Sequence, residues 1–271
     1  AFSPRLGAQY DIAERVMAYG QWQKGFKAGG FNALACNDPY DQEKVTAWEG
    51  GVKSSFLAGR VVFNVSAFHY DYTNLQKQQI VQMATLVENA AGAKTDGAEV
   101  ELIVVPAQGL RFNVGVSLLD ARYTDFVSCD GLLFPGNCSA ASIAAGTTVR
   151  ESVAGAPLPR APDYTFNAGA EYALPLPRDA QLVLRGEIYR SARIDFREFR
   201  DPLDRQRAYT LGNAYVTYLT RDGRLTIQGF VKNVGDTRVL GSVSAVPSPG
   251  FNRVGTYAAP RTYGLEIGTR F

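Results

Sequence analysis

The sequence predicts an all-β protein, namely a portion of an antiparallel up-and-down transmembrane β-barrel with about eleven strands. First, apolar and polar residues alternate with a period of two in segment after segment. Second, the connections between these segments are short and long in strict alternation. Third, the composition suits turns and pleated surfaces, since it includes 27 glycines, 14 tyrosines and 15 phenylalanines but only 2 methionines.

Each predicted strand places apolar side chains on one face and polar side chains on the other. The last strand is the clearest, because Tyr263, Leu265, Ile267 and Phe271 share one face while glycines and charged residues occupy the other. The predicted strands are residues 5–12, 16–26, 48–56, 61–72, 97–104, 110–118, 163–174, 182–188, 209–220, 225–232 and 261–271.

Three strands depart from simple alternation. The second and the ninth can be read in either phase. In the fourth, at 61–72, the apolar side chains change phase between Val65 and Phe68. One extra residue in a strand shifts every later side chain to the opposite face, so we expect a β-bulge near Ala67.

The connections fall into two classes that alternate along the chain. The short ones are residues 13–15, 58–59, 106–109, 175–179 and 221–224, and the long ones are 27–44, 74–93, 127–162, 192–207 and 240–260. In an antiparallel meander, alternate connections lie at opposite ends of the sheet. Outer-membrane barrels have this asymmetry, with short periplasmic turns and long extracellular loops, whereas a soluble sandwich has no general reason to sort its loops.

Composition excludes several other classes. No apolar run approaches the roughly 18–20 residues of a membrane helix, and a net charge of +2 argues against a nucleic-acid binder. One histidine, His69, and 3 cysteines leave little material for a metal site or a nucleophile–base pair. We therefore predict no catalytic residue, no metal and no cofactor, and we expect His69 at the outer end of a strand. The first residues lack a signal-peptide pattern, which leaves a processed start or a missing front end.

The polar face of the strands carries many charged residues. Because charge costs roughly 2–4 kcal/mol when it faces lipid at the midplane, this face is predicted to line the lumen. The predicted lumenal set is Glu49, Lys53, Glu99, Glu101, Arg111, Glu171, Arg185, Glu187, Lys232, Glu266 and Arg270.

An ordered series of motifs resembles one known family. Residues 25–32 read GFKAGGFN, 48–54 read WEGGVKS and 64–76 read NVSAFHYDYTNLQ; residues 89–93, 97–101, 159–162, 232–236 and 260–265 follow in family order. The series resembles TonB-dependent outer-membrane receptors. The terminal Phe271, with Tyr263, Leu265 and Ile267 before it, is similar to the signal for barrel assembly in the outer membrane.

The resemblance implies that residues 1–271 are the C-terminal part of the barrel, without the plug domain and the N-terminal barrel strands. In the family, the complete barrel has about 22 strands and a plugged lumen. No energy-coupling box is recognisable in the sequence. An odd number of strands in an up-and-down meander cannot close with antiparallel pairing throughout, and lipid does not tolerate the two unpaired edges that remain.

The implied function is TonB-energised uptake of a scarce nutrient, such as a ferric siderophore, across the outer membrane of a Gram-negative bacterium. The implied partners are outer-membrane lipid, lipopolysaccharide, the plug and remaining strands, the TonB complex acting through the plug, and the barrel assembly machinery. Nucleic acid is not expected. A soluble all-β ligand-binding module is the alternative. An outer-membrane enzyme is a weaker one, because the lone histidine has no matched partner.

Cys129 and Cys138 lie in the longest predicted loop. Outer-membrane loops mature in an oxidising compartment, so the resemblance favours a disulfide that constrains the loop by roughly 2–3 kcal/mol. The alternative is a pair of free buried thiols. Cys36, in another long loop, is the odd cysteine, and spacing does not decide whether it is free.

Residues 195–207 mix arginines with carboxylates. Arg197, Arg200 and Arg205 are candidates to face an anionic substrate or lipopolysaccharide phosphates. The favoured alternative is a solvated loop laced with ion pairs, each worth little. Lys27 and Phe31, in the loop at 27–44, are the other candidate substrate-facing residues.

Overall fold

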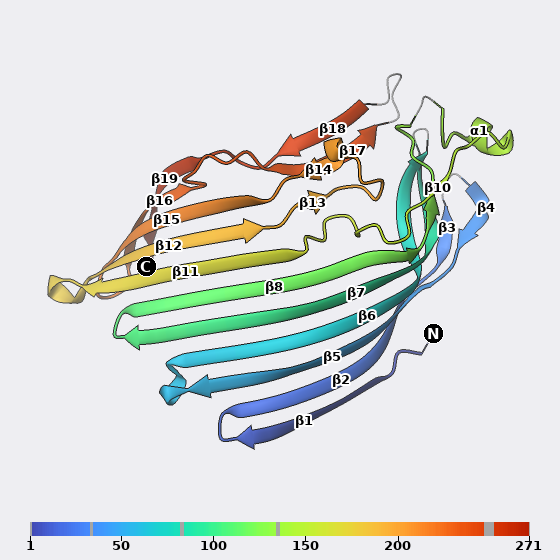
Figure 1. Ribbon diagram of the computed structural model, residues 1–271. Coiled ribbons are helices and arrows are strands. Elements are labelled where there is room, and N and C mark those ends of the chain that lie inside the picture. Colours follow the sequence, from blue (N-terminus) through green and yellow to red (C-terminus); the bar gives the residue numbers. More distant parts are fainter. Residues whose placement is uncertain (1, 33–34, 82–83, 134–135, 247–251, 271) are drawn as a thin grey trace.

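The computed structural model describes residues 2–32, 35–81, 84–133, 136–246 and 252–270. Within them, one 11-stranded antiparallel sheet curves into an open trough, and its strand order follows the chain (Figure 1). The strands are β1 (Arg5–Ala13), β2 (Val16–Lys27), β5 (Glu43–Phe56), β6 (Val61–Val81), β7 (Ala84–Ala107), β8 (Leu110–Asp125), β11 (Tyr164–Pro175), β12 (Gln181–Ser191), β15 (Tyr209–Leu219), β16 (Leu225–Lys232) and β19 (Thr262–Thr269). The predicted antiparallel meander is confirmed, with β1 and β19 at its two edges.

One end of the sheet carries the short turns. Two of these contain single 3₁₀ turns, η1 (Leu57–Gly59) and η2 (Pro177–Asp179). In the turn between β7 and β8, Gly109 has a φ of +77°, and a Cβ there would strike the carbonyl oxygen of Ala173 on β11. Glycine is therefore needed at this position, because an L side chain fits neither the backbone conformation nor the space.

The other end carries the long connections, and most of these fold into small hairpins. They are β3 (Gly30–Asn32) with β4 (Ala35–Tyr40), β9 (Val127–Ser128) with β10 (Glu151–Ser152), β13 (Ile194–Asp195) with β14 (Arg205–Gln206), and β17 (Leu240–Val246) with β18 (Asn252–Tyr257). A short helix, α1 (Ala140–Ala144), and a 3₁₀ turn, η3 (Pro202–Asp204), complete this end. In the part of the chain that the structure describes, no helix is long and apolar enough to cross a membrane.

The connection predicted at 74–93 is not an irregular loop. β6 and β7 continue there as a paired hairpin, from Leu75 opposite Ala90 to Val81 opposite Ala84. The prediction was wrong because this stretch lacks an apolar alternation. Beyond the membrane no lipid enforces that pattern, whereas backbone pairing still satisfies the peptide groups.

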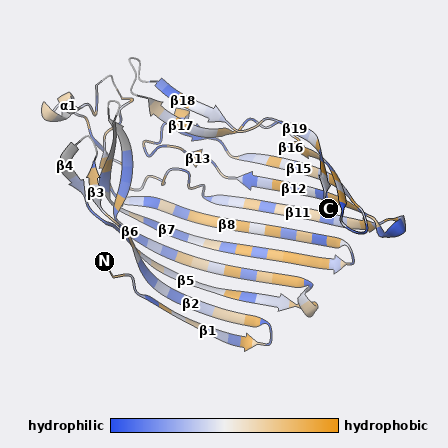
Figure 2. Ribbon diagram, turned by 180° about the vertical axis from the view of Figure 1, so that it is seen from behind, coloured by the Kyte–Doolittle hydropathy of each residue, from blue (hydrophilic) through white to orange (hydrophobic). Residues whose placement is uncertain are grey.

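The outward face of the sheet is apolar and uncovered. The side chains of Leu6 on β1 and Leu265 on β19 are 72% and 67% exposed, and Ile188 on β12 is 44% exposed. Hydrophobic and hydrophilic residues alternate along the strands in Figure 2. Because an apolar surface of this extent is unfavourable in water, it is suited to lipid.

The opposite face is polar, as predicted for the lumenal set. Strand registers place Glu171 between Arg111 on β8 and Arg185 on β12, so all three side chains lie on one face. The same holds for the other predicted lumenal charges wherever a register is described.

The bulge predicted near Ala67 is wrong. β6 pairs with β5 and with β7 in unbroken register through this residue. The phase change instead reflects a change of surroundings. Ala67 lies on the apolar outward face, but the next outward residue is His69, which lies 2.6 Å from Asp96 of β7. Phe68 therefore points to the lumenal side.

The same boundary crosses three neighbouring strands. Ala67, Ala98 and Leu118 form the last apolar row of the outward face, and the next row consists of His69, Asp96 and Asp120. Charged outward side chains are compatible with water or headgroups but not with acyl chains. This row marks the upper limit of the apolar band. The expectation that His69 lies at the outer end of a strand is wrong, because β6 continues beyond it to Val81.

Candidate functional site: the outer-loop assembly

The long connections pack into a core of their own above the apolar band. Its central side chains come from β7, β8 and the loop before β11. The buried members are Ala93, Tyr123, Phe126, Val153 and Ala156, and the partly buried Tyr72, Leu75, Leu158 and Phe199 pack against them. The rings of Tyr123 and Phe126 lie 5.1 Å apart. This packing fixes the loops relative to one another, because buried aromatic groups dominate the energetics of small cores.

The charged ammonium group of Lys77 on β6 lies within this core. Its ammonium forms an ion pair with Glu198, and the two side chains are only 16% and 6% exposed. The Lys77 Nζ atom also lies 6.0, 5.1 and 5.9 Å from the ring centres of Tyr123, Phe126 and Phe199. These are cation–π distances, so three ring faces and one carboxylate surround the ammonium.

Tyr123 remains neutral in this setting. Burial, followed by the negative charge of Glu198, raises the pKa of the Tyr123 phenol. A phenolate at this place would be buried beside the Glu198 carboxylate, so the phenol keeps its proton.

A second set of ion pairs joins three loops through Asp204. Arg197 binds Asp204 at 2.8 Å and also pairs with Asp130, while Arg253 of β18 binds Asp204 at 2.7 Å and pairs with Asp201. The side chain of Asp204 is 1% exposed. We call these five residues the arginine–aspartate network; it links the loop before β11, the loop after β12 and the β17–β18 hairpin.

The guanidinium of Arg197 stays charged. Burial lowers its pKa, but the hydrogen bond and charge of Asp130, together with the charge of Asp204, outweigh burial and raise the pKa above its usual range. Its carbon Cζ also lies 4.8 Å from the ring centre of Phe199. Carboxylates and an aromatic ring of this chain therefore already engage its cationic group.

The three arginines predicted as substrate-facing lie in different surroundings. Arg197 belongs to the arginine–aspartate network, and Arg205 donates to Asp195 at 2.5 Å. Arg200 is exposed, and no described residue forms an ion pair with it. The expectation of a solvated loop is wrong for Arg197, because the chain folds back on itself and buries the pairs.

The other two candidates lie apart from these arginines. Lys27 ends β2 opposite Glu43, and Phe31 of β3 is 71% exposed. No hydrogen bond or ion pair of the described residues connects either of them to the arginines.

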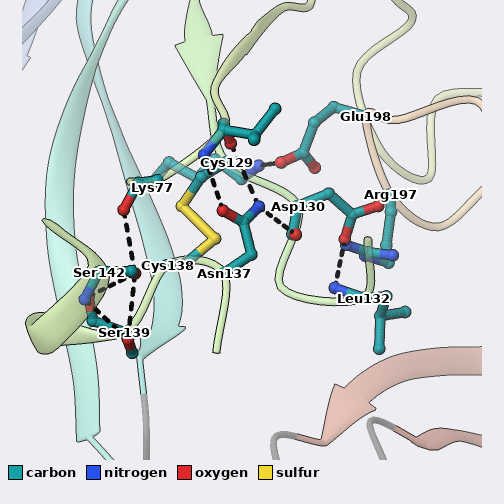
Figure 3. Close-up of a disulfide and its surroundings, with 12 residues drawn as sticks. Lys77, Cys129, Asp130, Leu132, Asn137, Cys138, Ser139, Ser142, Arg197 and Glu198 are labelled. Atoms are coloured by element: carbon teal, nitrogen blue, oxygen red, sulfur yellow. Dashed lines mark hydrogen bonds and ion pairs between the residues drawn. A yellow bond between two sulfur atoms is a disulfide. The ribbon is translucent and has the colours of Figure 1, made fainter. Parts of the chain in front are cut away.

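A disulfide joins Cys129 to Cys138, with their Cα atoms 5.8 Å apart (Figure 3). Asn137 makes two hydrogen bonds within the same loop. Its Nδ2 donates to the carbonyl oxygen of Asp130 at 2.8 Å, and its Oδ1 accepts from the Val149 amide at 2.8 Å, so the side chain stabilises the loop conformation. Cys36 lies among residues whose side chains the structure does not describe. The closed loop holds Asp130 where its carboxylate meets Arg197.

Thiol labelling checks this disulfide. With a maleimide under denaturing but unreduced conditions, we expect about one label per chain, on Cys36, because the other two thiols are oxidised. After reduction, intact mass should show three labels, since the sequence has 3 cysteines. Three labels before reduction would contradict the disulfide.

Sequence reasoning missed Lys77, Asp130 and Arg253 as parts of this assembly. Each lies far along the chain from its partner; Lys77 and Glu198 are 121 residues apart. The one available signal is that Asp130 directly follows Cys129. In the part of the chain that the structure describes, no group of three or more histidines, cysteines or carboxylates could hold a metal ion.

Two hollows accompany these features. A cavity of about 320 Å³ lies between the disulfide loop, the loop after β12 and β17. A shallower hollow of about 550 Å³ lies on the lumenal face, where Lys53, Glu99 and Glu101 are among the lining side chains. Nearby, Glu49 accepts hydrogen bonds from Tyr19 at 2.7 Å and from Gln21 at 3.1 Å.

A curved antiparallel sheet with an apolar outer face, a polar inner face and a folded outer-loop assembly defines the wall of a membrane β-barrel. The family model described as "TonB dependent receptor-like, beta-barrel" matches residues 1–234. The chain therefore belongs to the TonB-dependent receptor family.

One curated protein and several solved structures are similar to this chain. The metal-pseudopaline receptor CntO of Pseudomonas aeruginosa is 26% identical over 124 residues, which cover 46% of this chain and 17% of that protein. The crystal structure of the ferric yersiniabactin uptake receptor FyuA from Yersinia pestis has a TM-score of 0.75 at 18% identity, covering 97% of this chain and 36% of that one. The siderophore receptor PiuA from Acinetobacter baumannii has a TM-score of 0.72 at 17% identity, with 97% and 35% covered.

At these identities the solved structures show the fold alone. The chain spans about a third of their length and a smaller share of CntO. The family and these neighbours are transport receptors rather than enzymes.

Proposed function

We propose that residues 1–271 form the C-terminal part of the barrel of an outer-membrane receptor that imports a scarce nutrient, such as a ferric siderophore, with energy from the TonB complex. The family match over residues 1–234 carries this proposal. The short turns would face the periplasm and the outer-loop assembly the exterior, as in other outer-membrane barrels. The host would be a Gram-negative bacterium.

The partners follow from the surfaces. Strands supplied by the rest of the receptor would pair with the free edges of β1 and β19, because lipid does not tolerate open edges. A plug would lie against the polar lumenal face, and the TonB complex would act through that plug. Membrane lipid would cover the apolar face, and lipopolysaccharide would surround the barrel above the apolar band.

A metal chelate is the substrate class that the neighbours favour. The names of CntO and FyuA specify a metal-pseudopaline receptor and a ferric yersiniabactin uptake receptor. The alternative of a soluble ligand-binding module fits poorly, because in water the outward face would expose Leu6, Ile188 and Leu265 without cover.

Uptake measurements test the proposal. Cells that lack the receptor, and cells that carry it, are given radioactive iron bound to siderophores from the host culture, with and without an intact TonB complex. We expect uptake only with both the receptor and the complex. Equal uptake in cells without the receptor, or uptake independent of the complex, would contradict the proposal.

The C-terminal assembly signal gives a second expectation. Tyr263, Leu265 and Ile267 are on the outward face of β19, and Phe271 lies outside the described residues. Phe271→Ala in the intact receptor is expected to lower the amount inserted in the outer membrane, because recognition by the assembly machinery loses its terminal aromatic group. Surface labelling measures this amount, and an unchanged level would contradict the signal.

A further inference from the structure

The cavity in the outer-loop assembly is bounded mainly by apolar groups. Its walls include Leu132, Phe196, Phe199 and Val243, together with the disulfide-bonded Cys129 and Cys138. They come from three separate connections, so the cavity exists only because the loops are assembled.

The charged side chains Lys77, Glu198 and Arg197 in the wall already have partners within the chain, so none is free to pair with a charged ligand. Lys77 and Glu198 line the cavity but pair with each other. Arg197 also lines it, and its guanidinium is held by Asp130 and Asp204. A charged group entering this space would lose its hydration and find every counter-ion already engaged, which is strongly unfavourable.

Two exposed polar side chains, Gln78 and Ser244, also line the cavity, but the described, buried part of the wall has no unsatisfied side-chain hydrogen-bonding group. Within the described residues, no buried side-chain nitrogen or oxygen lacks a hydrogen-bond partner. On the buried part of the wall, a polar ligand group would exchange water for a surface whose polar atoms are already satisfied. An uncharged apolar group loses little hydration and gains dispersion contacts with the rings, so it is favoured here.

The volume sets the size of that group. An apolar cavity of about 150 Å³ binds benzene, and this cavity measures about 320 Å³. Two fused aromatic rings therefore fit.

We propose that this cavity binds an uncharged, two-ring aromatic group of the solute that the receptor imports. The proposal rests on the proposed function, since it names the part of the solute that the outer loops take. In this proposal the Arg197 guanidinium, paired with Asp130 and Asp204, stabilises the cavity wall and does not bind an anionic substrate.

Three ligands that share a ring system but differ in charge test the proposal. The purified intact receptor is titrated calorimetrically with 1-naphthol, naphthalene-1-sulfonate and protonated 1-naphthylmethylamine. We expect saturable binding of 1-naphthol and at least tenfold weaker binding of both charged ligands. Absence of 1-naphthol binding, or equal binding of a charged ligand, would overturn the proposal.

A cavity-filling variant and a matched control locate the site. Val243 of β17 is buried at the cavity, whereas Val254 of the paired strand β18 is 52% exposed. Val243→Phe should weaken 1-naphthol binding at least tenfold, while Val254→Phe should leave it unchanged. Unchanged binding in Val243→Phe would place the ligand elsewhere and overturn the assignment.

Leu132→Phe, which fills the same cavity from another loop, should give the same loss if Val243→Phe fails to fold. Failure of this inference is separable from failure of the proposed function. Iron uptake that persists while 1-naphthol binds no better than the charged ligands would refute the cavity assignment alone. Cavity binding without TonB-dependent uptake would refute the transport role alone.

Discussion

Asp204→Asn is expected to destabilise the outer-loop assembly by about 3–5 kcal/mol, because it leaves two arginines without their shared buried counter-ion. Asp204 is 1% exposed and accepts from both Arg197 and Arg253. Asparagine retains the size of the side chain but not its charge. The strands of the main sheet should be unaffected, since the network lies within the loops.

Hydrogen exchange of the intact receptor measures this effect locally. The amide of Phe196 donates to the Asp204 carbonyl and reports on opening of the loop. Its protection should fall by a factor of about 10²–10⁴, which corresponds to the expected loss of free energy.

Asp179→Asn is the matched control. The Asp179–Arg221 pair joins two short turns, the one between β11 and β12 and the one between β15 and β16, with side chains 69% and 76% exposed. Exposed pairs contribute about 0–1 kcal/mol, so protection near these turns should change little. If the two substitutions lowered amide protection equally, burial would not be the reason why the arginine–aspartate network stabilises the loops.

Val116→Arg is expected to reduce assembly of the receptor in the outer membrane severely. Val116 lies on the outward face of β8, between Val100 of β7 and Phe166 of β11. A lipid-facing arginine costs roughly 2–4 kcal/mol at the midplane and less near the interface, and Val116 lies one outward row inside the last apolar row at Leu118. The fraction of receptor that keeps the gel mobility of a folded barrel before boiling measures the loss.

Ser117→Arg, one residue further along, is the matched control. Ser117 faces the lumen and is paired in register with Glu99 and Thr165, so an arginine there meets water and a carboxylate. The folded fraction should stay close to that of the parent receptor. If both arginine variants assembled equally well, the assignment of outward and lumenal faces would be wrong.

The sheet was predictable from the sequence because each strand carries its own information. For example, the alternation that includes Leu265 and Ile267 assigns the two faces of the last strand without information from the neighbouring strand. The phase change after Val65 was misread because a bulge and a change of solvent produce the same pattern. Only the register, with His69 opposite Asp96, separates the two.

The outer-loop assembly was not predictable in the same way. Its decisive contacts join distant segments, such as Lys77 with Glu198 and Arg253 with Asp204. The sequence marks Arg197 as charged but gives no sign that the chain itself supplies two carboxylates to neutralise it. Charge composition alone therefore suggests an anion site, whereas the folded loops leave an electrically balanced pocket.

The direction of the two edge strands limits what can complete the barrel. β1 and β19 are the first and last of 11 antiparallel strands, so they run the same way. A second copy with its loops on the same side would offer only edges that run parallel to them. It could pair in antiparallel fashion only upside down, with its loops on the opposite side of the membrane. With antiparallel pairing throughout, self-association therefore cannot close this wall, and any segment that closes it must contribute an odd number of strands.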